Sequence, residues 1–323
     1  MNGLQNLGNT CYLNTIVQCV NCLPLLTKSI CETSFTPSIQ NIPGIIVTQF
    51  KIILFNLNTQ PIKTVVPHQL IKALEYFIQQ ADSGKNSIYT SISDIRSQND
   101  AHEFLILLLN IFHETFKDKV NIHISGEASS LYDKEVVNAM NSFKRFHENE
   151  YSCVTKFSTG QYISTLHNTQ KNTISTTYEP FTCVELEIPP EPEITVYDCL
   201  NHFTQNEKLS TGQYKSIQFW KLPQYLILTL KRFDGLSKNN KHVKIDTLIN
   251  LQNYCVGPER FSSSYKLVAV ANHTGSLDSG HYYAYCFSEM EKKWYVCNDS
   301  STRQIRQCSL STSHAYCLFY DKI

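Results

Sequence analysis

Hydrophobic residues in the first third of the chain recur at helical spacing. Between Leu13 and Val20 the apolar positions fall on one stripe, directly after Cys11. A second stripe runs through AHEFLILLLNIFHETF, which begins after Asp100. The pattern predicts one helix from Cys11 to the Leu23-Pro24 step, where proline stops it, and another from about Asp100.

The residue pattern changes after about Val154, where β-branched and aromatic residues alternate with polar ones. We expect strands in TISTTYEPFTCVELEIP, FWKLPQYLILTLKRF, YKLVAVANHTG, GHYYAYCF and KKWYVCND. A helix is expected over 134–146, and the polar segment 234–244 is predicted to be a mobile loop. Helices first and antiparallel strands later indicate an α+β protein.

Composition and charge indicate which classes of partner this protein is not expected to bind. The 323 residues are 42% hydrophobic and 17% charged, as in one large soluble catalytic unit, and 28 basic residues balance 28 acidic ones. This balance predicts neither a nucleic-acid nor a membrane partner. There is no signal segment, the twelve cysteines lack framework spacing, and both glycosylation sequons (at Asn272 and Asn298) fall near the candidate site. We therefore expect a cytoplasmic or nuclear protein with reduced thiols.

Cys11 lies at the N-terminus of the first predicted helix. Asn9 or Thr10 could cap the first turn, where free backbone N–H groups and the helix dipole favour a thiolate, which is the reactive form of cysteine. A plain alternative is a small buried core residue, the usual state of a free cysteine. A catalytic role needs a partner histidine.

His281 is the strongest partner candidate, because a polar glycine-containing loop precedes it and an aromatic strand follows in SLDSGHYYAY. A hairpin would bring Asn298 and Asp299, in KKWYVCND, beside its ring. One of these oxygens would accept the Nδ1–H and aim Nε2 at the thiol, which completes a nucleophile–base–orienter set. Taken singly, a structural histidine and an ordinary turn are the plainer interpretations.

Six segments in order resemble the ubiquitin-specific protease family. GLQNLGNTCYLN resembles its cysteine box, and SGHYYAY with WYVCNDS resembles its histidine box. SQNDAHEFLILLLN, EPFTCVELEIP, LPQYLILTLKRF and HAYCLFYDK match further family segments. The resemblance implies a papain-like fold with thumb, palm and fingers. It implies a single catalytic domain over 1–323, with a helical thumb at 1–118 and a palm at 119–323 whose reduced fingers lie at about 154–220.

The resemblance also implies roles for individual residues. Cys11 would be the nucleophile, His281 the general base and then acid, and Asn298 the third member, with Asp299 as its rival. Asn6 matches the position whose amide helps to form the oxyanion hole, together with the Cys11 backbone N–H.

Family members cleave after the C-terminal Gly-Gly of ubiquitin, whose tail carries arginines, so carboxylates and amides should line the channel. Matching positions for the tail are Gln98, Asp100 and Glu103, and for the narrow Gly-Gly passage His273, Gly275, Gly280 and Tyr282. Asp100 could also simply begin a helix, a favourable place for an acid.

The chain departs from the family at the fingers, where most members carry two CxxC pairs that bind zinc. Positions corresponding to the first pair lie near Asn168 and Lys171, and the interval 207–221 contains no cysteine. Cys19-Val20-Asn21-Cys22 is a single pair, which favours the core over a metal, because structural zinc needs four ligands. We expect no metal and no cofactor.

The favoured interpretation is a monomeric deubiquitinating thiol hydrolase that acts on ubiquitin or ubiquitin-conjugated proteins. A protease for another Gly-Gly modifier has the same chemistry, and sequence alone does not separate the two. A catalytically silent ubiquitin-binding module should have lost Cys11, His281 or Asn6, and none is missing. A structural protein whose thiols merely pack would not require the ordered segments.

Overall fold

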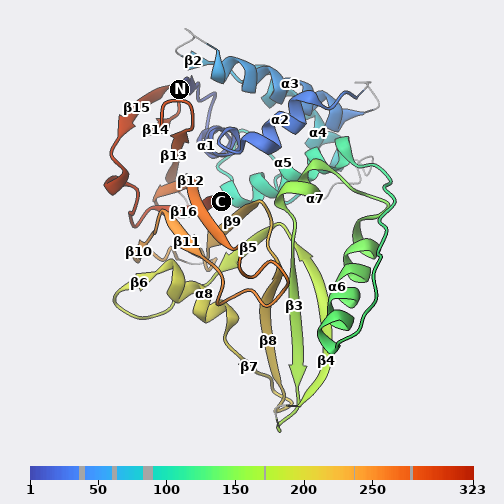
Figure 1. The fold of residues 1–323 in the computed structure, drawn as a ribbon. Coiled ribbons are helices and arrows are strands. Elements are labelled where there is room, and N and C mark those ends of the chain that lie inside the picture. Colours follow the sequence, from blue (N-terminus) through green and yellow to red (C-terminus); the bar gives the residue numbers. More distant parts are fainter. Residues whose placement is uncertain (36–40, 60–63, 83–89, 171, 236, 277–278) are drawn as a thin grey trace. The chain divides into compact units, whose positions relative to one another are not determined.

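The chain forms two compact units in the computed structural model, which describes residues 1–35, 41–59, 64–82, 90–170, 172–235, 237–276 and 279–323 (Figure 1). Unit 1 consists of Met1–Phe116, Arg232–His242 and Val268–Phe319. Unit 2 consists of Lys117–Lys231, Val243–Leu267 and Tyr320–Ile323. The N-terminal helices therefore share a unit with strands from the C-terminal part of the sequence.

Unit 1 contains the predicted helical region. Its helices are α1 (Cys11–Asn21), α2 (Pro24–Glu32), α3 (Ile42–Asn58), α4 (His68–Asp82) and α5 (Ala101–Phe116). Pro24 does not simply stop a helix, because it is the first residue of α2, where a missing N–H costs no hydrogen bond. All of α1 except Asn21 is buried, and Tyr12 packs edge-to-face on Phe104 of α5, with ring centroids 5.4 Å apart.

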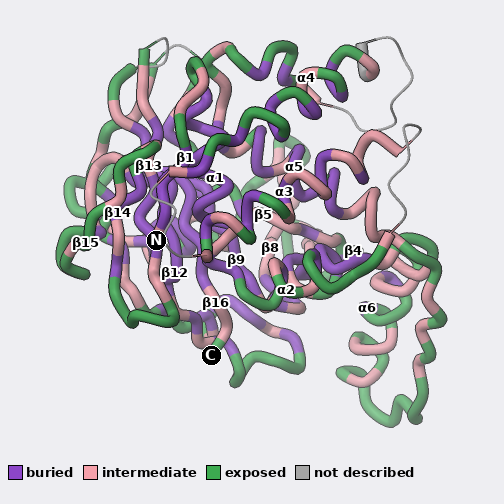
Figure 2. Tube along the Cα trace, turned by 90° about the horizontal axis from the view of Figure 1, so that it is seen from above, coloured by how far each residue is buried: buried purple, intermediate pink, exposed green. Residues whose placement is uncertain are grey.

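The strands of unit 1 form a mostly antiparallel layer against α1. They are β13 (Gly280–Ser288), β14 (Lys293–Asn298), β15 (Ser301–Ile305) and the larger parts of β12 (Ser264–Gly275) and β16 (Ala315–Lys322), in the order β15-β14-β13-β12-β16. Figure 2 shows buried chain where α1 lies beside β13. Two short strands, β1 (Gly3–Leu4) and β2 (Thr64–Val65), pair in parallel, and η1 (Gln307–Ser309) is a 3₁₀ turn.

Unit 2 contains an antiparallel sheet of four strands in the order β4-β3-β8-β7. Its members are β3 (Gly160–His167), β4 (Thr173–Phe181), β7 (Glu207–Lys208) and β8 (Tyr214–Lys221). The predicted helix over 134–146 is confirmed as α6 (Leu131–His147), which begins with a capping box and lies along β4 (Figure 1). The other elements of unit 2 are α7 (Cys153–Ser158), α8 (Val196–Thr204), β5 (Cys183–Leu186), β6 (Ile194–Thr195), β9 (Tyr225–Leu230), β10 (Val243–Lys244) and β11 (Leu248–Asn250).

Aromatic rings hold the base of the four-stranded sheet. Tyr162 stacks on Phe181 with ring centroids 4.1 Å apart, and Phe219 lies 5.6 Å from Tyr162 and 5.5 Å from Phe181. Phe219 is fully buried. This cluster supplies the cohesion that a small sheet needs from apolar packing.

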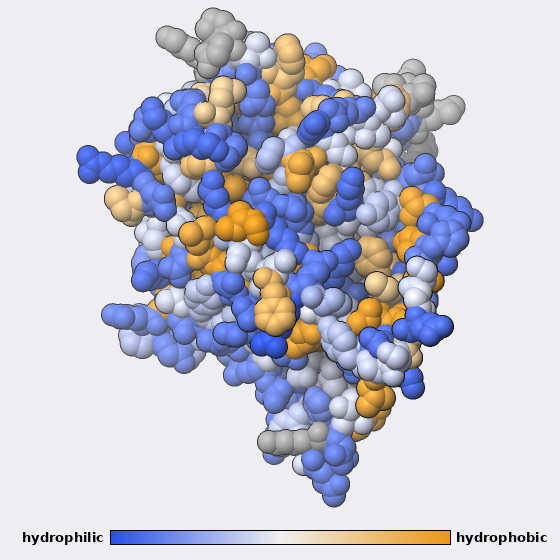
Figure 3. Space-filling view, in the orientation of Figure 1, coloured by the Kyte–Doolittle hydropathy of each residue, from blue (hydrophilic) through white to orange (hydrophobic). Residues whose placement is uncertain are grey.

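The described residues at the hairpin tips of this sheet are hydrophilic (Figure 3). The Asn168 side-chain oxygen accepts the N–H groups of Gln170 and Asn172, each at 2.9 Å, and so shapes the β3–β4 turn. Lys171 lies outside the described residues. The β7–β8 turn uses Gly212 at a φ of +80° and offers no thiol.

The predicted α+β class is confirmed, since helices dominate the first third and strands the rest. Not every pairing is antiparallel, because β5 pairs with β9 and β6 with β10 in parallel. Among the helices in the described ranges, none combines the length and apolar character that crossing a bilayer requires.

Candidate active site

Cys11 is the first residue of α1 and follows a sharp turn. Gly8 and Asn9 both have positive φ angles, of 103° and 51°. The predicted side-chain cap is wrong, because Thr10 occupies the N-cap position without bonding to the first turn. Its hydroxyl donates instead to Asn6 Oδ1, at 3.2 Å. The first turn of α1 thus keeps backbone N–H groups that no N-cap side chain satisfies, and such groups bind anions.

His281, at the start of β13, hydrogen-bonds with the Cys11 side chain, although the two residues lie near opposite ends of the sequence. This bond is the largest influence on the imidazole and raises its pKa to about 9, against the opposing effect of burial. A hydrogen bond to Asn298 and the charge of Asp299 also raise the pKa. The pair can therefore hold an imidazolium beside the sulfur at neutral pH.

Asn298 orients the imidazole through the ring nitrogen opposite to the one predicted. Its Oδ1 lies 2.7 Å from His281 Nε2. The prediction that Nδ1 bonds the orienting group and Nε2 faces the thiol is therefore wrong. With Nε2 bonded to Asn298, Nδ1 is the ring nitrogen left for Cys11.

Asp299 does not orient His281, although it follows Asn298 directly. Its φ of +47° turns the side chain away. One carboxylate oxygen accepts the amide of Asn6 at 3.0 Å, and the other accepts the amide of Asn14 at 2.8 Å. Asp299 thus acts on the first segment of the chain, and Asn298 acts on the histidine.

Asn6 is fixed from both ends of its side chain. Its Oδ1 accepts the N–H groups of Gly8 and Thr10, at 3.0 and 3.2 Å, while Nδ2 donates to Asp299. An amide nitrogen carries two hydrogens, so the second can serve an oxyanion. The structure thus places a rigid donor group in the turn that ends at Cys11.

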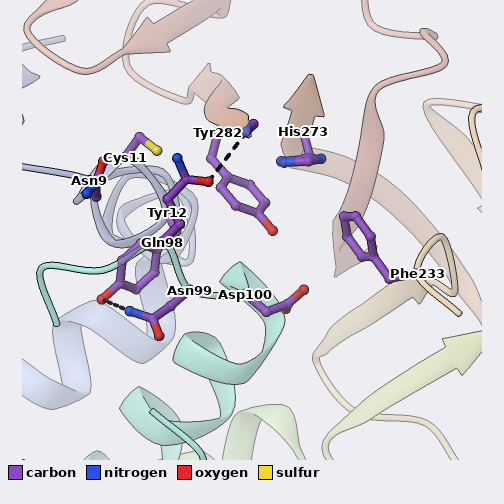
Figure 4. A pocket seen from close by; sticks show the side chains of 10 residues that line it. Asn9, Cys11, Tyr12, Gln98, Asn99, Asp100, Phe233, His273 and Tyr282 are labelled. Carbon is purple, nitrogen blue, oxygen red and sulfur yellow. Dashed lines mark hydrogen bonds between the residues drawn. The ribbon is translucent and has the colours of Figure 1, made fainter. Parts of the chain in front are cut away.

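A pocket of about 190 Å³ opens beside Cys11 (Figure 4). Of the predicted substrate residues, the pocket brings together Gln98, Asp100, His273, Gly280 and Tyr282. Gly275 and Glu103 do not line it.

Asp100 is already engaged in structure. One carboxylate oxygen accepts the N–H groups of His102 and Glu103 at the start of α5, at 2.6 and 3.2 Å. The other accepts the Tyr316 hydroxyl at 2.7 Å. The interpretation of Asp100 as an acid that begins a helix is therefore confirmed, and the same residue lines the pocket. Glu103 is exposed in the first turn of α5.

The wall opposite α5 comes from the β12–β13 hairpin. The His273 imidazole packs so closely on Gly280 that a Cβ there would lie 2.0 Å from Nε2, so only glycine fits. Burial, followed by the charges of Lys238 and of two neighbouring histidines, lowers the pKa of His273 to about 4, and the ring is neutral at physiological pH. Gly275 lies at the hairpin turn with a φ of +87°.

Sequence reasoning missed Asn14 and Phe233. Asn14 lies one helical turn after Cys11, on the same face of α1, so helical spacing could have indicated it. Phe233 lines the pocket and contacts the His273 ring edge-on, with centroids 5.2 Å apart. No local pattern marks Phe233, because the β12 strand that it meets is remote from it in the sequence.

Cys19 and Cys22 are core residues, as predicted. Both are buried, and the Cys286 thiol hydrogen-bonds with them and with Cys297. Burial raises the pKa of Cys286 well above its ordinary value, which suppresses thiolate formation. These thiols pack α1 against β13 and β14.

A family model described as ubiquitin carboxyl-terminal hydrolase matches residues 2–320. The chain belongs to this family. Sequence relatives include ubiquitin carboxyl-terminal hydrolase 4 of Vanderwaltozyma polyspora and Usp2 of Drosophila melanogaster, each 28% identical over 99% of this chain. The chain spans 41% and 34% of those two proteins, so each carries much sequence beyond the matched part.

Solved structures support the same fold. The Ubp8-containing DUB module of SAGA matches with a TM-score of 0.75 and 23% identity over 100% of this chain and 68% of that chain. The same module bound to ubiquitin aldehyde matches with a TM-score of 0.72 and 23% identity, over 100% of this chain and 70% of that chain. These likenesses confirm the predicted ubiquitin-specific protease fold.

Proposed function

We propose that this chain is a cysteine-type deubiquitinase that hydrolyses the isopeptide or peptide bond after the C-terminal glycine of ubiquitin. The observation that carries the proposal is the histidine contact: His281 bonds the Cys11 side chain on one edge and Asn298 on the other. Family membership supports this chemistry, and a structural neighbour is described as bound to ubiquitin aldehyde.

Attack by the Cys11 sulfur on the terminal glycine carbonyl begins the reaction. The imidazolium of His281 stabilises the thiolate, and the C–S bond forms as the carbonyl electrons move to oxygen. The Asn6 amide and the Cys11 backbone N–H would receive this oxyanion. One such donor typically contributes about 3 kcal/mol of barrier reduction.

Collapse of this intermediate releases the amine of the conjugated protein. His281 donates the Nδ1 proton to the leaving nitrogen and becomes neutral, which leaves a thioester between Cys11 and ubiquitin. A water then gives its proton to His281 and attacks the thioester carbonyl. The C–S bond then breaks and its electrons return to sulfur, which restores the Cys11 thiolate beside the imidazolium of His281. The carboxylic acid loses its proton to solvent and leaves as a carboxylate.

The pocket wall suits a chain of two glycines. His273 and the Gly280 backbone are in close contact, and Tyr282 presents its ring between Cys11 and His273 in Figure 4. A narrow passage admits residues without side chains and rejects bulkier ones by steric clash. Gln98 and Asp100 remain our proposed contacts to the polar tail, and Glu103 and Gly275 are proposed only as outer residues.

Other Gly-Gly modifiers have the same chemistry, so a protease for such a modifier is the second candidate. Its support is that the pocket beside Cys11 would contact only the last residues of a modifier, and Gly-Gly modifiers share those residues. We also propose, from composition alone, a monomeric protein of the cytoplasm or nucleus, without nucleic-acid or membrane partners and without zinc or another cofactor.

A turnover assay with a ubiquitin C-terminal fluorophore tests the proposal, with Cys11→Ala as the matched variant. The wild type should release the fluorophore, and the variant should lose roughly four or more orders of magnitude in kcat. Equal rates for the two proteins would remove the enzyme hypothesis. Parallel substrates made from other Gly-Gly modifiers separate the two candidate functions.

A further inference from the structure

A buried arginine organises the loop between β9 and β10. Arg232 is 1% exposed, and its Nε donates to the carbonyl of Ala315 at 2.5 Å. Its Nη1 donates to the carbonyls of Asn239 and Lys241, each at 2.8 Å. The sequence predicts a mobile loop at 234–244, and these contacts argue against that prediction for its described residues.

Lys238, in the same loop, bonds the end of strand β12. Its Nζ donates to the carbonyls of His273, at 2.7 Å, and Gly275, at 3.1 Å. Carbonyls of residues i and i+2 point to the same edge of a strand. The His273 N–H bonds His314 on that edge, just before β16 begins. Lys238 therefore continues the pairing of β12 past the start of β16.

The two residues that Lys238 binds, His273 and Gly275, flank Thr274, which lies opposite the histidine that bonds Cys11. In the antiparallel register, Thr274 pairs with His281 and Gly275 with Gly280. The His273 ring also presses on Gly280 across the hairpin. Any shift of β12 at His273 or Gly275 is therefore transmitted to the backbone that carries His281.

We propose that Lys238 is a positioning residue for catalysis. Its ammonium group fixes the last residues of β12 and, through them, the Gly280–His281 backbone, so that the imidazole meets Cys11 and the pocket wall keeps its shape. This inference rests on the proposed function, because it assigns Lys238 a role in that reaction.

The electrostatics of the hairpin agree with this role. Burial lowers the pKa of the Lys238 amine, and its two charge-assisted bonds to carbonyls compensate for that burial. After burial, the Lys238 charge is the largest influence that depresses the pKa of His273. Burial first and the Lys238 charge second thus favour a neutral His273 beside His281.

Three variants test the inference in the full chain. Lys238→Met removes the donors and should lower kcat for a ubiquitin–fluorophore substrate about tenfold, with KM changed less than about twofold, because misplaced catalytic groups act on the chemical step. Lys238→Arg keeps charge and donors and should recover much of the rate. Lys244→Met, at an exposed lysine of β10, is the control and should match the wild type.

A second readout is independent of turnover. The pKa of His273, followed by NMR, should rise from about 4 in Lys238→Met, because one depressing charge is gone. The inference is overturned if Lys238→Met turns over within twofold of the wild type, or if it is unfolded where the wild type is folded, which would make Lys238 a stability residue only. If the wild type cleaves none of the substrates, the proposed function fails. The His273 titration alone then supports or overturns the contact of Lys238 with the end of β12.

Discussion

The hairpins β13–β14 and β3–β4 have the same antiparallel pairing but different surroundings. β13–β14 packs on α1, and its ends carry His281 and Asn298, which hydrogen-bond each other. β3–β4 is half-exposed along most of its length, and its tip is shaped by Asn168 bonding to its own turn. The first hairpin therefore presents side chains to a segment that is distant in the sequence. In the second hairpin, the Asn168 side chain hydrogen-bonds to backbone groups of its own turn.

This difference teaches that backbone pairing alone does not make a site. A polar side chain at a strand end becomes reactive when a separate buried element supplies its partner, as α1 supplies Cys11 to His281. On the four-stranded sheet, aromatic packing around Phe219 gives cohesion, and among the described residues no such partner lies at the tip. Substitutions at the two hairpins should accordingly separate catalysis from stability.

Among variants that keep the Cys11 nucleophile, Asn298→Ala should have the largest effect on activity, a loss of roughly a thousandfold in kcat/KM, because the imidazole loses its orienting acceptor. The pH profile should also change. In the wild type, the proposed activity should fall as pH rises through about 9, the pKa of His281, because the imidazolium loses its proton there. Since the bond to Asn298 helps to raise that pKa, the falling limb should move to lower pH in the variant.

Asn172→Ala, at the tip of the β3–β4 hairpin, is the matched control and should stay within twofold of the wild type. An unchanged alkaline limb in Asn298→Ala would show that the acceptor does not tune the imidazole.

Asn6→Ala should reduce kcat by about a hundredfold, because one oxyanion donor is lost. Alkylation of Cys11 by iodoacetamide forms no tetrahedral oxyanion, so its rate should change little. If alkylation slows as much as turnover does, Asn6 serves to shape the turn before Cys11 and not to bind the oxyanion.

Phe219→Ala should lower the stability of the protein and leave the reactivity of Cys11 nearly unchanged. Removing this buried ring should lower the free energy of unfolding by about 3–5 kcal/mol, as for other large core truncations. The alkylation rate of Cys11 in the folded protein should remain within about twofold. Denaturant titration and alkylation of the same sample provide both values, and a parallel loss in reactivity would contradict the separation of the two regions.

Chelation should have the smallest effect. The hairpin tips of the four-stranded sheet offer an amide and a glycine turn, so EDTA should leave Tm unchanged. Stoichiometric zinc in the purified protein, or a fall of several degrees in Tm with EDTA, would contradict this expectation.

Much of the fold and site could be predicted because the signals are local. Helical spacing marked α1 and α5, alternation marked β12 to β14, and Cys11 and His281 each stood in a distinctive segment. The contact between Cys11 and His281 can be predicted only when both segments are considered together, because neither residue is informative alone.

The missed details depend on tertiary geometry. Which nitrogen of His281 faces Asn298 depends on how the ring is oriented in the folded protein, and no sequence pattern encodes that orientation. Asp299 and Asn298 are neighbours of similar chemistry, and only a positive φ at Asp299 sends one to Asn6 and the other to the imidazole. Lys238 contacts the far end of β12, a strand that two further strands separate from it in the sequence.

Covalent labelling by ubiquitin with a C-terminal electrophile tests the central claim most directly, followed by peptide mapping of the adduct. The account predicts one adduct, on Cys11, although Cys31 and Cys308 are far more exposed among the twelve cysteines. Iodoacetamide should modify those exposed thiols as well. A ubiquitin adduct on any other cysteine, or none on Cys11 in folded protein, would contradict the account.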